Sequence, residues 1–146
     1  MNDDSNGGTK PLLGHVLLPV ANERDARRTA SALGPYDPDR VTALHVVEKG
    51  GGVPDKTPVE HSEELAAESY AAVREVFPDA EEHTAYSREV VDAIFEAAAA
   101  VDASAIAYRA REGNRLVQFL SGDLSIKLIT NADRPVIALP HRETSE

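Results

Sequence analysis

Short apolar runs alternate with longer amphipathic segments along most of the chain. The first run, residues 15–20, is continuously apolar after His15, which is typical of a strand covered on both faces. Pro19 lacks a backbone N–H and should therefore lie near the end of this strand. Further runs predict strands over residues 41–47, 103–108 and 135–139, and the mostly polar residues 81–86 predict an edge strand.

The segment after the first strand has the pattern of an amphipathic helix. Asn22 can act as its N-cap, and Ala26, Ala30 and Leu33 recur at intervals that place them on one helical face. Gly34, followed by a proline, stands where a C′ residue belongs, so the helix is expected to end there.

Three more helices are predicted further along the chain. The second begins at a capping box with Thr57 as the N-cap, and it runs to about Phe77. Ser87 is a candidate N-cap for the third helix. The fourth is expected over residues 123–130, with Ile129 on its inward face.

Strands alternating with helices are typical of βαβ units and predict an α/β fold. We expect a three-layer, doubly wound, Rossmann-like architecture: an open sheet of five mainly parallel strands in the order 3-2-1-4-5, with four helices. Such sheets bind ligands outside the carboxyl ends of their strands, where the strand order reverses. The loops at that point follow the first strand, at Ala21 and Asn22, and the fourth strand, from Arg109 onward.

Composition narrows the class of protein. The chain has 146 residues, 42% hydrophobic and 5% aromatic, enough for one domain with an aliphatic core over residues 14–140. Residues 1–13 and 141–146 are expected to be flexible tails. Without cysteine, disulfide scaffolds and thiolate metal sites are excluded. No apolar stretch is long enough for a membrane span, and no secretory signal is recognisable, so a cytoplasmic location is expected.

The charge balance is strongly acidic. The formal net charge is −10, which argues against a nucleic-acid partner, since that affinity comes largely from basic residues. The basic residues comprise 11 arginines and only 4 lysines. An acidic chain poor in lysine favours a protein from a salt-adapted, halophilic organism, although an ordinary acidic protein has the same charge sign.

Short matches near both ends of the sheet resemble a known family. Leu18-Pro19-Val20 before a helix, then residues 44–47, resemble the first half of the universal stress protein fold. Gly122 opening the last helix and residues 133–137 resemble its second half. The resemblance covers residues 14–140. It implies an adenine nucleotide alpha hydrolase-like fold, a role in the stress response, and homodimers formed through the last strand.

The nucleotide-binding branch of that family carries an Asp after the first strand and the motif G-x2-G-x9-G-(S/T) before the last helix. Here Ala21 takes the place of the Asp, which would accept hydrogen bonds from ribose, and Ala107 and Ala110 replace the first two glycines. Asp123 stands in place of Ser or Thr, where a carboxylate would repel phosphate. The resemblance therefore implies the branch without the ATP-binding motif, and no cofactor.

An arginine-rich loop leaves a second interpretation open. Arg109, Arg111 and Arg115 follow the fourth strand and could hold an anion, such as ATP or AMP, without a glycine cradle. Alternatively, they lie over the sheet edge and pair with neighbouring acids. The candidate nucleotide- or anion-binding residues are Val20, Ala21, Asn22, Val46, Ala107, Arg109, Arg111, Arg115, Gly122 and Asp123.

Other constellations point to no chemistry. The five histidines have no metal-binding spacing, although His15 and His45 could be neighbours across paired strands; His45 is more simply a satisfied core histidine. No serine stands in a nucleophile motif, so we expect no metal, no catalytic residue and no enzyme.

Three functions remain. The first is a stress-response or signalling module that acts by association, without a nucleic-acid or membrane partner. The second is a nucleotide or small-anion binder, or a slow ATPase, and the third is a flavin domain of the same architecture, which a yellow colour would reveal. An apolar last strand at the sheet edge favours a homodimer. The candidate dimer-interface residues are Pro135, Val136, Ile137, Ala138 and Leu139.

Overall fold

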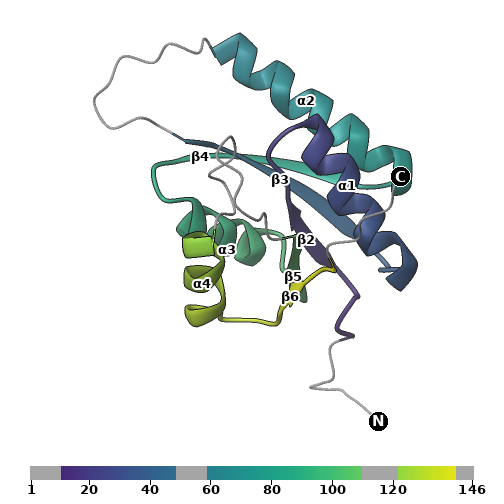
Figure 1. The fold of residues 1–146 in the computed structure, drawn as a ribbon, viewed down its shortest axis with the longest axis vertical. Coiled ribbons are helices and arrows are strands. Elements are labelled where there is room, and N and C mark those ends of the chain that lie inside the picture. The colour runs from purple at the N-terminus through teal and green to yellow at the C-terminus, as the bar shows by residue number, and fades with distance from the viewer. Residues whose placement is uncertain (1–10, 49–58, 110–121, 141–146) are drawn as a thin grey trace.

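The computed structural model of the chain describes residues 11–48, 59–109 and 122–140 (Figure 1). Its elements, in chain order, are β2 (Val16–Pro19), α1 (Glu23–Leu33), the 3-10 helix η1 (Gly34–Tyr36), β3 (Val41–Glu48), α2 (Val59–Val76), β4 (Glu81–Ser87), α3 (Val90–Ala100), β5 (Ala105–Tyr108), α4 (Gly122–Thr130) and β6 (Val136–Ala138).

The five strands form one parallel sheet in the order β4-β3-β2-β5-β6. Numbered along the chain, this is the predicted order 3-2-1-4-5, and the α/β prediction is confirmed. Val16 of the central strand lies opposite Val41 of β3 and Ala105 of β5, which fixes the register. The order reverses between β2 and β5, at the predicted position.

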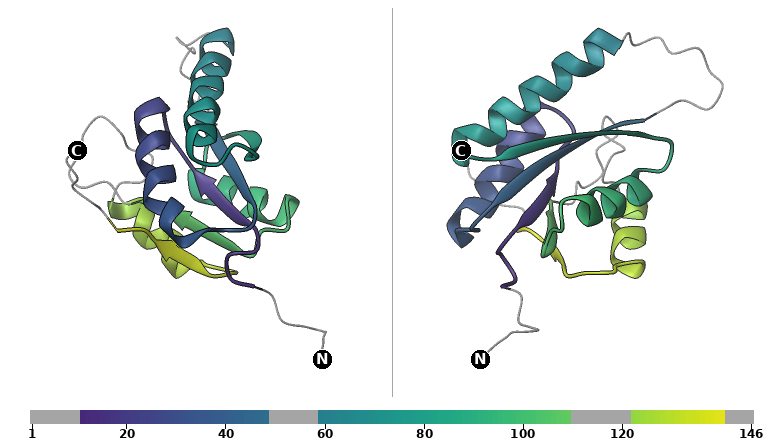
Figure 2. Two further views of the ribbon diagram at one scale, coloured as in Figure 1. Left: turned by 90° about the vertical axis from the view of Figure 1, so that its right-hand side faces the viewer. Right: turned by 180° about the vertical axis from the view of Figure 1, so that it is seen from behind.

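Helices cover both faces of the sheet (Figure 2). Leu18 of β2 packs with residues of α1 and α2, whereas its neighbour Leu17 packs with residues of α3 and Leu128 of α4. Successive side chains of a strand point to opposite faces, so β2 supplies core residues to both layers. This explains why its sequence is apolar without interruption.

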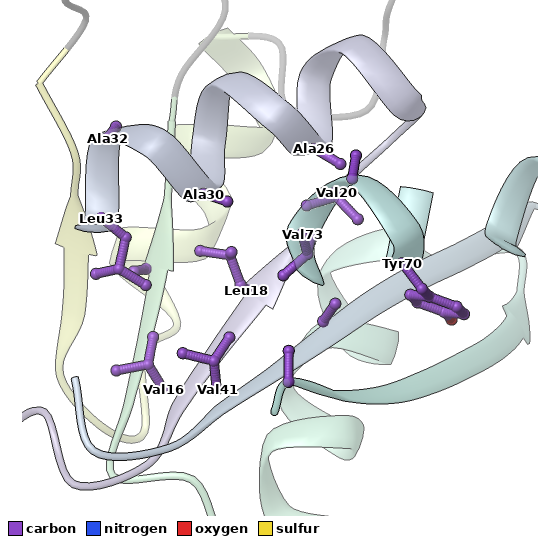
Figure 3. Close-up of a cluster of buried hydrophobic side chains, with 14 of the residues drawn as sticks. Val16, Leu18, Val20, Ala26, Ala30, Ala32, Leu33, Val41, Tyr70 and Val73 are labelled. Atoms are coloured by element: carbon purple, nitrogen blue, oxygen red, sulfur yellow. The ribbon is translucent and has the colours of Figure 1, made fainter. Parts of the chain in front are cut away.

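The cluster beneath α1 and α2 is built from small and branched residues (Figure 3). Ala26 and Ala30 of α1 have no exposed surface, and Val73 of α2 lies against the same core. Alanines on α1 let that helix lie close to the strands, and full burial of each valine or leucine contributes about 1.5–3 kcal/mol.

Helix α1 begins and ends where the sequence predicts, but it does not stop cleanly at Gly34. Asn22 is the N-cap as expected, and its side chain accepts a hydrogen bond of 2.8 Å from the Asp25 N–H. Gly34, however, has right-handed backbone angles (φ −49°, ψ −44°), and the chain continues into η1. The left-handed residue that stops the turn is Asp37, with φ 55°. Pro35 fits the start of a 3-10 turn, so the helix tightens before it ends.

Two further details of the helices were predicted wrongly. Ser87 is the last residue of β4, and Glu89 is the N-cap position of α3; the Ser87 hydroxyl instead accepts a hydrogen bond of 3.1 Å from the Glu89 N–H. Ile129 of α4 is 56% exposed, because Ser125 and Leu128 form the buried side of that helix. The proposed capping residue Thr57 lies outside the described residues.

The guanidinium of Arg134 ties the end of α3 to the start of the last strand. It donates to the carbonyl oxygens of Ala98 and Ala103, at 3.1 and 2.8 Å. These contacts satisfy backbone acceptors where a helix ends. Among the described helices, none combines the length and the apolar character that crossing a bilayer requires.

Candidate ligand-binding edge of the sheet

The turn from β2 into α1 forms the centre of the carboxyl edge. The Val20 N–H donates to the Leu44 carbonyl at 2.8 Å, which extends the pairing of β2 and β3 by one residue. The chain then turns through Ala21 and enters the helix at Asn22. The three predicted residues Val20, Ala21 and Asn22 therefore lie where the strand order reverses.

Asp25, in the first turn of α1, returns to this turn. One oxygen of its carboxylate accepts a hydrogen bond of 2.7 Å from the Ala21 N–H. The other accepts from the Thr29 hydroxyl at 3.3 Å. The Asp25 residue is only 2% exposed. A carboxylate thus lies beside residue 21 after all, but both of its oxygens are engaged inside the protein.

Arg109 reaches the same place from β5. This residue directly follows the strand and is 5% exposed. Its Nη2 atom lies 3.9 Å from Oδ1 of Asp25, so a buried cation faces the buried carboxylate. Arg109 is thus buried and not spread over the sheet edge, and it pairs with an acid, as the alternative interpretation of the arginine-rich loop expected.

Two other predicted site residues, Ala107 and Val46, lie on opposite faces of the sheet. Ala107, two residues before Arg109, has no exposed surface and belongs to the cluster beneath α1 and α2. Val46 of β3 is buried on the opposite face of the sheet, with residues of α3. The sequence prediction grouped these two residues, but their side chains lie in different layers.

The last helix begins at the same edge. Gly122 is the first residue of α4 and Asp123 is the second. Arg111 and Arg115 lie outside the described residues, as does Ala110. The structure thus brings Arg109 to the reversal point and leaves the other two arginines of the predicted cluster without a description.

Two buried polar atoms near this edge have no hydrogen-bond partner among the described residues. They are Nδ1 of His45, at the level of Val20 on β3, and Oγ of Ser125, in the first turns of α4. The His45 residue is 6% exposed, and burial lowers the pKa of its imidazole. The expectation of a satisfied core histidine is met in part, because the Val20 backbone hydrogen-bonds the ring whereas Nδ1 has no such partner among the described residues. Buried polar atoms of this kind are uncommon and require an explanation.

The histidines that the structure describes do not gather at one place. The register places His15 at the amino end of the sheet and His45 near its carboxyl end, so the two are not neighbours. Over the described ranges, no three His, Asp or Glu side chains come together as a metal would require.

Sequence reasoning missed Asp25 and Thr29 as part of this edge. Both are buried polar residues on the inner face of α1, four residues apart. The available signal was their spacing with Ala26, Ala30 and Leu33, which makes them share a side of the helix. A polar side chain on the buried side of a helix is expected to have a hydrogen-bond or ion-pair partner inside the protein.

The predicted dimer strand lies at the edge of the sheet. The Ile106 N–H donates to the Pro135 carbonyl, and the Leu139 N–H donates to the Tyr108 carbonyl, so the two residues that flank β6 face β5. Val136 and Ala138 alternate with them and turn their backbone groups outward. Val136 and Ile137 are half-buried, and Ala138 is exposed.

Comparisons with known proteins agree on the family. The family model described as the universal stress protein family matches residues 14–140. Among curated proteins, none matches the chain.

Solved structures with a similar fold include universal stress proteins. One from Archaeoglobus fulgidus is 24% identical with a TM-score of 0.60, and the match covers 86% of this chain and 97% of that one. The structure of the A. fulgidus protein in complex with dAMP is 23% identical, with a TM-score of 0.60, and covers 86% and 96%. A universal stress protein in complex with cAMP is 14% identical, with a TM-score of 0.56, and covers 85% and 95%.

The order of the strands, the helices on both faces and a family match over nearly the whole length lead to one conclusion. This chain belongs to the universal stress protein family.

Proposed function

We propose that the protein is a cytoplasmic stress-response module of the universal stress protein family that acts by association, without binding ATP or AMP in the family's usual manner. The observation that carries this proposal is the buried pair of Asp25 and Arg109 at the point where the strand order reverses. Among the described residues, no arrangement of side chains favours catalysis over association.

The pair opposes a nucleotide in two ways. The Asp25 carboxylate is 2% exposed and already accepts hydrogen bonds from inside the protein on both oxygens, so ribose hydroxyls have little access to it. Arg109 faces that carboxylate, which offsets the positive charge that a phosphate would need. The methyl group of Ala107 also occupies a position where the family motif has glycine.

Titration calorimetry tests this proposal directly. ATP, AMP and inorganic phosphate are each titrated into the intact protein and into the Arg109→Ala variant. We expect Kd values weaker than about 1 mM, which corresponds to less than about 4 kcal/mol of binding free energy. Micromolar binding of any of the three to the unaltered protein would contradict the proposal.

The alternative is a nucleotide or small-anion site at the same edge. It is favoured by the partnerless Nδ1 of His45 and Oγ of Ser125, which a polar ligand would satisfy, and by the relatives described in complex with dAMP and cAMP. If the calorimetry detects binding that the Arg109→Ala variant loses, this alternative replaces the first proposal.

Association is proposed to occur through β6. The outward backbone groups of Val136 and Ala138 are free to pair with β6 of a second copy, antiparallel to it. Edge pairing of this kind joins two sheets into one without moving any helix.

Two substitutions at one position separate pairing from packing. Ala138→Pro removes an outward N–H while leaving the bonds to β5 intact, and Ala138→Val keeps that N–H. Sedimentation at tens of micromolar should show dimers for the unaltered protein and Ala138→Val, and monomers for Ala138→Pro. Monomers of the unaltered protein would contradict the proposed interface.

A further inference from the structure

A second group of polar side chains lies at the opposite, amino end of the sheet. His15, just before β2, is 7% exposed, and its Nε2 atom lies 2.7 Å from the hydroxyl oxygen of Thr42 on β3. Thr42 is 1% exposed. The imidazole and the hydroxyl therefore interact away from water, on neighbouring strands.

The contact continues to the surface through β4. The Thr42 hydroxyl lies 3.4 Å from Oε1 of Glu81, the first residue of the edge strand. Nη2 of Arg40 lies 2.9 Å from the same carboxylate oxygen. The side chain of Glu81 is 49% exposed. A continuous chain of polar atoms thus leads from a buried imidazole across two strands to solvent.

The proton on the neutral imidazole can be assigned from its two partners. The backbone of Val101 hydrogen-bonds the ring and raises the pKa of His15, as a carbonyl accepting from a ring N–H does. Since Nε2 faces Thr42, that N–H is on Nδ1. In the neutral ring Nε2 is therefore an acceptor, and the Thr42 hydroxyl donates to it.

Charged groups face His15 from three sides. Burial lowers its pKa most, and Arg40, preceding β3, lowers it further. Glu81 of β4 and Asp102, between α3 and β5, act in the opposite direction. The pKa of Glu81 is itself lowered, chiefly by its hydrogen bonds with Arg40, which favours the carboxylate form of Glu81.

We infer that His15, Thr42 and Glu81 form a proton-responsive hydrogen-bond chain, in which proton uptake by His15 reverses the Thr42 hydroxyl from Nε2 towards the Glu81 carboxylate. In the protonated ring Nε2 becomes a donor, and the Thr42 oxygen accepts from it. The hydroxyl hydrogen can then turn towards Oε1 of Glu81. Every polar hydrogen of the chain keeps a partner in both states.

The consequence is a link between acidity and the edge strand. The protonated state adds a donor to Glu81, the residue at which β4 begins, and thus strengthens the connection of β4 to β3. This device lies at the opposite end of the strands from the Asp25–Arg109 pair and does not depend on the proposed function.

Nitrogen NMR of the imidazole rings tests the inference on the intact protein. Spectra between pH 8 and pH 4.5 give the pKa of each histidine and its tautomer. In Thr42→Val the protonated Nε2 loses its acceptor, so the proton affinity of His15 should fall about tenfold, or one pKa unit. Thr42→Ser, which retains a hydroxyl, should restore it.

Further variants decide between a hydrogen-bond chain and simple packing. Glu81→Gln should lower the proton affinity of His15 by a smaller factor than Thr42→Val does. Because the Glu81 side chain is exposed, this variant keeps the test available if Thr42→Val fails to fold. Thr130→Val makes the same chemical change on α4 and should leave the His15 titration unaltered. An unchanged His15 titration in Glu81→Gln, or a neutral ring protonated on Nε2, would overturn the inference.

Discussion

At the scale of single residues, the Asp25 carboxylate makes several contacts at the carboxyl edge of the sheet. It accepts from the Ala21 N–H, accepts from Thr29 and faces Arg109. Removing one partner of a buried ion pair leaves the other charge without compensation, which is more damaging than losing a surface pair.

We therefore predict that Asp25→Ala lowers the free energy of unfolding by about 3–5 kcal/mol. Asp92→Ala is the matched control, because Asp92 also stands in the first turn of a helix but is exposed. It should lose only about 0.3–1 kcal/mol, from the helix dipole. Urea unfolding measures both, and equal losses would contradict the assigned role of the buried pair.

His45 makes stability depend on pH in a defined direction. Burial lowers its pKa in the folded protein below the ordinary value of 6.5, so the unfolded chain binds more protons below that pH. Stability is complete above pH 6.5 and is lost as the pH falls towards the lowered pKa. His15 contributes in the same sense.

Denaturant unfolding measured between pH 7.5 and pH 5 should show a free energy of unfolding that falls with acidity. The fall should be at most about 1.4 kcal/mol per pH unit for each histidine. The His45→Gln variant should show a shallower dependence. This window lies above that of the carboxylates with lowered pKa values, Glu75, Glu81 and Asp133. Identical slopes for the two proteins would exclude His45 as a source of the effect.

At the scale of elements, α1 is defined by its cap. The Asn22 side chain satisfies one of the N–H groups that a helix start leaves without a partner. We predict that Asn22→Ala destabilises the protein by about 1 kcal/mol, with an unchanged denaturant slope. Asn131→Ala, at an exposed residue after α4, should change little, and an equal effect of both substitutions would argue against the capping role.

The elements themselves could be predicted because their signals are local. An unbroken apolar run identified β2, and Asn22 marked the start of α1, since each signal depends only on nearby residues. The end of α1 before Gly34 was predicted correctly, but the 3-10 turn that follows was not, because Gly34 permits a left-handed turn without requiring one. Ile129 was placed inside because its face of α4 depends on which neighbours cover it.

The candidate site could be located but not described from the sequence. The predicted strand order indicated where the order reverses. Arg109 was predicted to lie there because it directly follows β5. The contact between Arg109 and Asp25 joins residues 84 positions apart, and helical periodicity alone cannot specify such a pairing. The buried polar face of α1 was the signal that sequence reasoning left unused.

At the scale of the whole molecule, net charge is the dominant feature. Ten excess negative charges repel one another across the surface, and dissolved salt screens that repulsion. The exposed ion pairs, such as Arg27 with Glu75 and Arg40 with Glu81, are also screened, but exposed pairs of this kind contribute little to stability.

We therefore predict that the midpoint of thermal unfolding rises when potassium chloride is increased from dilute to molar concentration. Calorimetric scans across that series provide the measurement, with a scan in sucrose at low salt as a control for general preferential exclusion. A midpoint that stays constant in potassium chloride would count against adaptation to high salt.

The position of β2 also determines how the molecule can open. Leu17 anchors one helical layer and Leu18 anchors the other, so neither layer has a core of its own that would survive loss of this strand. Deuterium should therefore replace the amide hydrogens of Leu17 and Leu18 last, and at one common rate, because both become accessible only when the entire fold is lost. Exchange followed by NMR would read global stability from these two amides, and early labelling of either would reveal a partly opened form.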